Sequence, residues 1–149
     1  DGFSKYCISQ RVFNHYKGIN LRVWGCFGEY EDKERFFYRS INNYIQKKDI
    51  VIYKDKQMDF IYANDLYKIL CPYLEDINIL HPRDLNCVYE KKYYLSEIAE
   101  MINNLDDYKV NIVKLDQELD LSYVGTYNYP NINHNGLEHG IKLCWSKWK

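Results

Sequence analysis

The sequence predicts an α/β fold, in which helices and strands alternate along a chain of 149 residues. Two observations support this prediction. Short runs rich in β-branched and aromatic residues, typical of buried strands, recur along the chain. Between them lie segments whose apolar residues repeat at the three- and four-residue spacing of an amphipathic helix. Because such alternation is characteristic of parallel sheets covered by helices, we expect an α/β architecture.

The first elements are a helix, a strand and a second helix. Residues 2–17 carry spaced apolar side chains and are followed by Gly18, a residue type that commonly ends helices. Residues 19–24 form a short apolar run that leads into a glycine-containing loop, as buried parallel strands do. Residues 35–45 repeat their apolar side chains at helical spacing and predict the second helix.

Two strands and a third helix are predicted in the middle of the chain. Residues 49–53 and 58–63 are short and apolar, and the polar turn between them suggests that they are neighbouring strands. Asn64 or Asp65 is expected to cap the helix that follows. Pro72 must either lie within this helix or end it early, because proline lacks the backbone donor that a helix interior uses.

The last third of the chain predicts strand, helix, strand and helix. Residues 85–89 read as a strand, and 95–102 carry an apolar stripe with helical spacing. Residues 110–115 alternate as a strand, and 136–142 suggest a short closing helix after a turn-rich stretch. We find no internal repeat and no low-complexity linker, so one domain is expected.

The charge balance and cysteine content indicate a cytoplasmic protein with no nucleic-acid or membrane partner. Twenty basic and 21 acidic residues leave a net charge of −1, which attracts neither nucleic acid nor an anionic membrane. No apolar run approaches the length of a membrane span, and no signal peptide is evident. Five cysteines without metal-binding spacing favour reduced, mostly buried thiols: Cys7, Cys26, Cys71, Cys87 and Cys144.

Five short motifs follow one another along the chain. They are Gly-Phe-Ser-Lys-Tyr at 2–6, Leu-Arg-Val-Trp-Gly-Cys-Phe-Gly at 21–28, Asp-Phe-Ile-Tyr-Ala-Asn-Asp-Leu at 59–66, Tyr-Leu-Ser-Glu-Ile-Ala at 94–99 and Gly-Leu-Glu-His-Gly-Ile at 136–141. Each is weak alone. In this order they resemble the C-terminal half of the extended short-chain dehydrogenases/reductases, the NAD-dependent nucleotide-sugar epimerase/dehydratase family.

The resemblance implies the C-terminal part of a Rossmann-like NAD(P)-binding fold and a small α/β substrate-binding subdomain. Residues 1–34 would end the Rossmann-like core, and 35–149 would form mainly the subdomain, with some elements returning to the core. The implied partners are NAD or NADP, a nucleotide-diphosphate sugar and the missing N-terminal half of the fold, with a homodimer possible. None of the seven glycines belongs to a glycine-rich dinucleotide turn, so this chain alone is expected to be inactive.

The family's catalytic tyrosine and lysine lie four residues apart on one helix. Lys5 matches the lysine, which holds the nicotinamide ribose and favours the tyrosine's phenolate. The tyrosine position is Asp1, whose carboxylate is a poor proton donor at neutral pH. Two interpretations stay open: Asp1 is a natural departure from the family, or it reflects a boundary at which the chain was cut.

Other site residues follow from the resemblance as well. Trp24, Gly25 and Cys26 lie on the loop that covers the nicotinamide and the sugar, and Gly25 replaces an asparagine that contacts the substrate diphosphate. Met58 replaces an arginine that clamps a phosphate. Arg35 and Arg39 on the next helix are candidates to compensate for that loss, against the alternative of ordinary surface arginines.

The remaining polar candidates are expected to be structural. By resemblance Asp59 and Asp65 are structural carboxylates rather than a catalytic pair, and Asp65 is expected near a helix N-terminus. His134 and His139 lack the acidic partners of a metal site, and no metal is predicted.

The leading functional hypothesis is one part of an NAD(P)-dependent nucleotide-sugar epimerase, dehydratase or reductase that acts through hydride transfer at the sugar. The alternative is a degenerate, noncatalytic relative that serves as a binding or assembly module. Loss of the family's residues at Asp1, Gly25 and Met58 favours the alternative.

Overall fold

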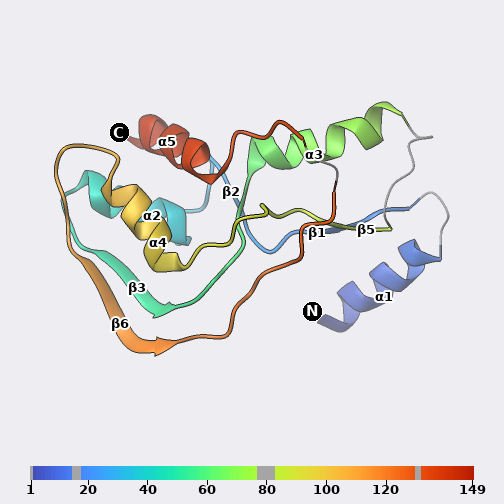
Figure 1. The fold of residues 1–149 in the computed structure, drawn as a ribbon, viewed down its shortest axis with the longest axis horizontal. Coiled ribbons are helices and arrows are strands. Elements are labelled where there is room, and N and C mark those ends of the chain that lie inside the picture. The colour runs from blue at the N-terminus through green and yellow to red at the C-terminus, as the bar shows by residue number, and fades with distance from the viewer. Residues whose placement is uncertain (1, 15–17, 77–82, 130–131) are drawn as a thin grey trace.

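The computed structural model describes residues 2–14, 18–76, 83–129 and 132–149, and it contains alternating helices and strands (Figure 1). The alternation confirms the predicted α/β class. The elements are α1 (Gly2–Phe13), β1 (Asn20–Arg22), β2 (Cys26–Phe27), α2 (Phe36–Ile45), β3 (Ile50–Asp55), β4 (Ile61–Tyr62), α3 (Ala63–Glu75), β5 (Asp84–Asn86), α4 (Leu95–Asn103), β6 (Ile112–Leu119) and α5 (Leu137–Trp148).

The strands form three parallel pairs, β1 with β5, β2 with β4, and β3 with β6. The expectation that the segments 49–53 and 58–63 neighbour each other is therefore wrong, because β3 and β4 pair with different strands. The polar turn between them does not form a β-hairpin. Instead, its backbone carbonyl groups accept hydrogen bonds from distant segments: Lys56 O accepts from Leu95 N at 3.0 Å, and Gln57 O accepts from Tyr123 N at 2.8 Å.

The main hydrophobic core lies where α2 and α4 pack together and against β3, and where α5 packs on α2 and β4. Figure 1 shows α2 and α4 over the β3–β6 pair, at the end of the molecule opposite α1. Phe37 and Ile41 of α2 are fully buried, and the Phe37 ring stacks on Phe27 with centroids 3.9 Å apart. Aromatic stacking and burial of this kind supply much of the free energy that holds a small domain together.

Helix α1 and strand β1 are far less covered. α1 has no buried residue, and Phe3 is 79% exposed and Ile8 64% exposed. In β1 the side chain of Leu21 also faces solvent. Figure 1 shows α1 beside β1 and β5, away from the main core. The helix predicted over 2–17 is present as Gly2–Phe13, and residues 15–17 lie outside the described part of the chain.

Two helix ends differ from expectation. Helix α3 begins at Ala63, so neither Asn64 nor Asp65 is its cap; Asp65 lies in the first turn, where a negative charge is favourable. Pro72 lies inside this helix and does not end it. Helix α5 continues to Trp148, beyond the predicted 136–142, and Gly136 precedes it with φ of 90°, a conformation that favours glycine. Among the helices of the described residues, none has the length and apolar character of a membrane span.

Candidate functional site

A groove of about 660 Å³ lies between α1 and β1. Lys5, Ile8 and Ser9 line it from the helix, and Trp24 lines it just beyond the carboxyl end of β1. β1 and β5 run parallel, so their carboxyl ends meet at the same edge. Open α/β sheets bind ligands at that edge. The groove thus brings together two residues that the sequence predicts for one site, Lys5 and Trp24.

Trp24 forms a fixed wall of this groove. Its indole meets the ring of Tyr123, another lining residue, edge-on at 6.4 Å between centroids. Gly125 lies directly against the indole, and a Cβ at that position would be only 2.3 Å from it. Any side chain at position 125 would therefore displace Trp24.

A buried ion pair holds the loop that carries Gly125. The Asp59 carboxylate, 4% exposed, accepts hydrogen bonds from Lys92 Nζ at 2.8 and 2.9 Å and from Gly125 N at 2.7 Å. Lys92 Nζ also donates to Tyr89 O at 2.7 Å. Asp59 thus ties three segments together behind Trp24, in keeping with its expected structural role.

Gly25 and Met58, the two positions where the family's polar contacts are replaced, are both packed against protein. Gly25 is buried, and a Cβ there would lie 2.6 Å from the Phe60 ring. Met58 is partly buried against the core, and its backbone forms an isolated parallel β-bridge with Tyr123. In this arrangement neither residue offers a charged or hydrogen-bonding side chain to a phosphate.

Cys26 and Arg35 line a second pocket, of about 290 Å³, at the carboxyl ends of β2 and β4. Glu31 is in the same pocket with a side chain only 2% exposed, and its carboxylate lies 3.5 Å from Arg35 Nε. Burial raises the pKa of Glu31 to about 7 although Arg35 opposes the shift. Burial also raises the pKa of the Cys26 thiol, which makes it a poor nucleophile at neutral pH.

Arg39 does not join this pocket. Its guanidinium lies over the Tyr53 ring, 5.1 Å from the centroid. The two candidate arginines therefore point to different surroundings. The position of Asp1 lies outside the described residues, as do those of His15 and His81.

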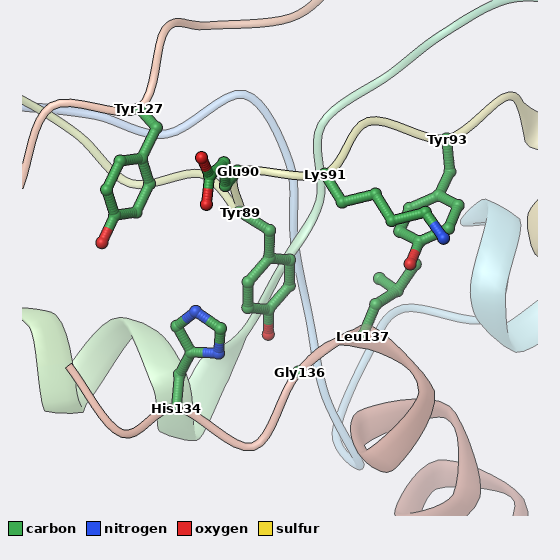
Figure 2. Close-up of a pocket in the computed structure, with 8 residues that line it drawn as sticks. All are labelled: Tyr89, Glu90, Lys91, Tyr93, Tyr127, His134, Gly136 and Leu137. Atoms are coloured by element: carbon green, nitrogen blue, oxygen red, sulfur yellow. The ribbon is translucent and has the colours of Figure 1, made fainter. Parts of the chain in front are cut away.

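A third pocket, of about 420 Å³, was not anticipated from the sequence (Figure 2). It brings together tyrosines that the sequence offers only as scattered aromatic residues, together with His134 from the turn before α5. Its lining residues are Tyr89, Glu90, Lys91, Tyr93, Tyr127, His134, Gly136 and Leu137. Nowhere in the part of the chain that the structure describes do three His, Cys, Asp or Glu side chains gather as metal ligands would.

Comparison with solved structures shows the same fold in enzymes of nucleotide-sugar metabolism. UDP-glucuronic acid 4-epimerase from Bacillus cereus, solved with a fluorinated UDP-glucuronic acid and NAD, is 17% identical with a TM-score of 0.71, over 95% of this chain and 48% of that one. An NAD-dependent NDP-hexosamine 5,6-dehydratase of tunicamycin biosynthesis is 13% identical with a TM-score of 0.74, over 95% and 50%.

A third similar structure is the GDP-mannoheptose C4 reductase from Campylobacter jejuni with NADP bound, at 14% identity and a TM-score of 0.66, over 95% of this chain and 53% of that one. This chain thus spans about half the length of each of these three proteins. No curated protein matches the sequence.

Sequence similarity to a family model covers all the residues that line the groove except Tyr123. The model of the NAD dependent epimerase/dehydratase family matches residues 3–87, more than half of the 149 residues. The match includes Lys5 on α1, strand β1, Trp24 just beyond it, and strand β5. The chain belongs to the NAD dependent epimerase/dehydratase family.

Proposed function

We propose that this chain is the substrate-facing half of an NAD(P)-dependent enzyme that epimerises, dehydrates or reduces a nucleotide-diphosphate sugar. The observation that carries the proposal is the groove at the carboxyl end of β1, where Lys5 and Trp24 lie together. Family membership supports the assignment of this groove to the dinucleotide, because the segment that matches the family model contains both residues.

Within this proposal Lys5 binds the nicotinamide ribose. An ammonium group is suited to this role, since it donates several hydrogen bonds and its charge lowers the pKa of a nearby phenol. Trp24 offers a rigid aromatic surface beside it and keeps water from that side of the bound ring. When bound, the dinucleotide supplies the hydride transfer on which epimerases, dehydratases and reductases of this kind depend.

We propose further that another polypeptide segment completes the fold on the open side of α1 and β1. Exposed apolar residues on α1, among them Phe3 and Ile8, support this, as does the solvent-facing Leu21 in β1. Uncovered apolar surface and unpaired strand edges are usually buried by a partner. A glycine-rich dinucleotide turn would be contributed by that segment, because this chain has none. The homodimer stays a prediction.

A noncatalytic binding module is the second candidate. It is favoured by Gly25 and Met58, which offer no side-chain contact to a diphosphate. Arg35 does not remove this objection, because its guanidinium lies beside the carboxylate of Glu31.

Turnover by the complete protein distinguishes the two candidates. The protein is incubated with NAD or NADP and a panel of UDP-, GDP- and dTDP-sugars, and the products are separated chromatographically. The proposal predicts a new sugar nucleotide, formed at least about a hundredfold more slowly by Lys5→Ala, a loss typical of removing one acid/base or positioning group. Lys48→Ala, which changes an exposed lysine between α2 and β3, is the control. Absence of product with every sugar and both cofactors would favour the binding module.

A further inference from the structure

The pocket in Figure 2 is built from three segments far apart in the sequence. Residues 89–93 follow β5, Tyr127 lies in the loop after β6, and residues 134–137 lead into α5. The pocket's volume of about 420 Å³ is within the roughly 300–1,000 Å³ typical of sites for small ligands. None of its lining residues belongs to the groove at Lys5.

A buried carboxylate fixes the shape of this pocket. Asp65, 0% exposed, accepts hydrogen bonds from the Tyr89 hydroxyl at 2.6 Å, from Asn135 N at 2.7 Å and from Gly136 N at 2.8 Å. The Tyr89 hydroxyl in turn accepts from Tyr62 N at 3.3 Å. Two walls of the pocket therefore share one anchor and cannot move apart without breaking buried hydrogen bonds, so the pocket is preorganised.

The walls are largely aromatic. The His134 ring meets Tyr89 edge-on at 5.0 Å between centroids, and Lys91 Nζ lies 4.8 Å from the centre of the Tyr93 ring. Figure 2 shows Tyr127 and Glu90 on one side of the space and His134 on the other, with the Tyr89 ring beside them. Rings held in this way offer flat surfaces to which the C–H faces of a cyclic ligand can pack.

The side chains of Glu90, Lys91 and His134 make no hydrogen bond or ion pair with other described residues. Lys91 and His134 each contact an aromatic ring instead. One acidic and one basic side chain leave no excess of either charge. A site without net charge gives phosphate no general electrostatic advantage, whereas hydroxyl groups can donate to the carboxylate and accept from the ammonium.

From this combination we infer that the pocket binds a neutral sugar ring, at a site separate from the groove at Lys5. The apolar face of the ring packs on the partly buried Tyr127, and its hydroxyls bond to Glu90, Lys91 and His134. This ligand carries no phosphate. It is therefore a free sugar or a residue of a glycan, distinct from the nucleotide-sugar of the proposed reaction.

Saturation-transfer NMR with methyl glycosides of glucose, galactose and N-acetylglucosamine tests the inference. We expect saturable transfer to the ring protons of at least one glycoside, with a Kd on the order of 1 mM, as for a small ligand with few contacts. Added inorganic phosphate should not compete. No saturable transfer from any of the three, or complete competition by phosphate, would overturn the inference.

Variants assign the binding to this pocket. Tyr127→Ala removes an aromatic wall, and Glu90→Gln changes an exposed side chain that holds no other residue in place. Each should weaken the affinity at least about tenfold, while Tyr30→Ala, at a 91% exposed tyrosine outside the pocket, should not change it. Unchanged affinity in both pocket variants would show that the sugar binds elsewhere.

Discussion

Glu31 should make the stability of this protein depend on pH in the physiological range. Burial raises the pKa of its carboxyl from 4.5 to about 7. Between these values the folded state holds a proton that the unfolded state has lost, so the free energy of unfolding falls as pH rises and is constant above the folded pKa. Each pKa unit is worth about 1.4 kcal/mol, which sets an upper limit of about 3 kcal/mol.

We expect about 1–2 kcal/mol of this, because local relaxation and entry of water around the ionised carboxylate reduce the cost of burying its charge. Urea unfolding followed by circular dichroism at several pH values between about 5 and 8 measures it. Glu31→Gln, which cannot ionise, should be more stable than the wild type at the upper end of this range and lose the advantage at the lower end. Glu34→Gln, at an exposed glutamate, controls for net charge. A stability difference between the wild type and Glu31→Gln that stays constant with pH would show that the pKa of Glu31 is not raised in the folded protein.

Three further substitutions test the packing by urea unfolding. Asp59→Asn leaves the ammonium of Lys92 without its carboxylate partner and should cost about 2–4 kcal/mol; a loss no greater than that of the surface variant Asp116→Asn would rule out a stabilising ion pair. Gly140→Ala places a Cβ about 2.8 Å from the Tyr62 ring and should cost about 1–3 kcal/mol, and an unchanged midpoint would mean that the ring moves freely. Phe37→Ala empties a fully buried site and should cost about 3–5 kcal/mol; a loss under about 1 kcal/mol would contradict the described core.

The type of most elements was predictable because it depends on local periodicity, whereas β2 (Cys26–Phe27) lies in the stretch that was expected to be a loop. Phe37 and Ile41 repeat at helical spacing, and both are buried on one face of α2. Strand pairing was not predictable in the same way. Ile50 lies opposite Ile112, 62 residues away, and no short-range pattern indicates which of several apolar runs will be its neighbour.

The groove at Lys5 was predictable through its motifs, whereas its supports were not. Lys5 and Trp24 each lie in a short motif that resembles the family, within the segment that matches the family model. By contrast, Asp59 is bonded to Lys92, which lies 33 residues later in the sequence, and to Gly125, which lies 66 residues later. Such contacts depend on the folded chain as a whole. The same holds for the pocket in Figure 2, whose walls Asp65 joins through hydrogen bonds to Tyr89 and Asn135.

In the proposed function, Lys5 faces the nicotinamide end of a dinucleotide held mainly by polypeptide outside this chain. Titration of the complete protein with NAD(H) and NADP(H) tests this most directly, with Lys5→Ala compared against Lys48→Ala. The claim predicts an affinity at least about tenfold weaker for Lys5→Ala alone, and no measurable binding to residues 1–149 by themselves. Equal affinities in the two variants, or clear micromolar binding by the isolated chain, would contradict it.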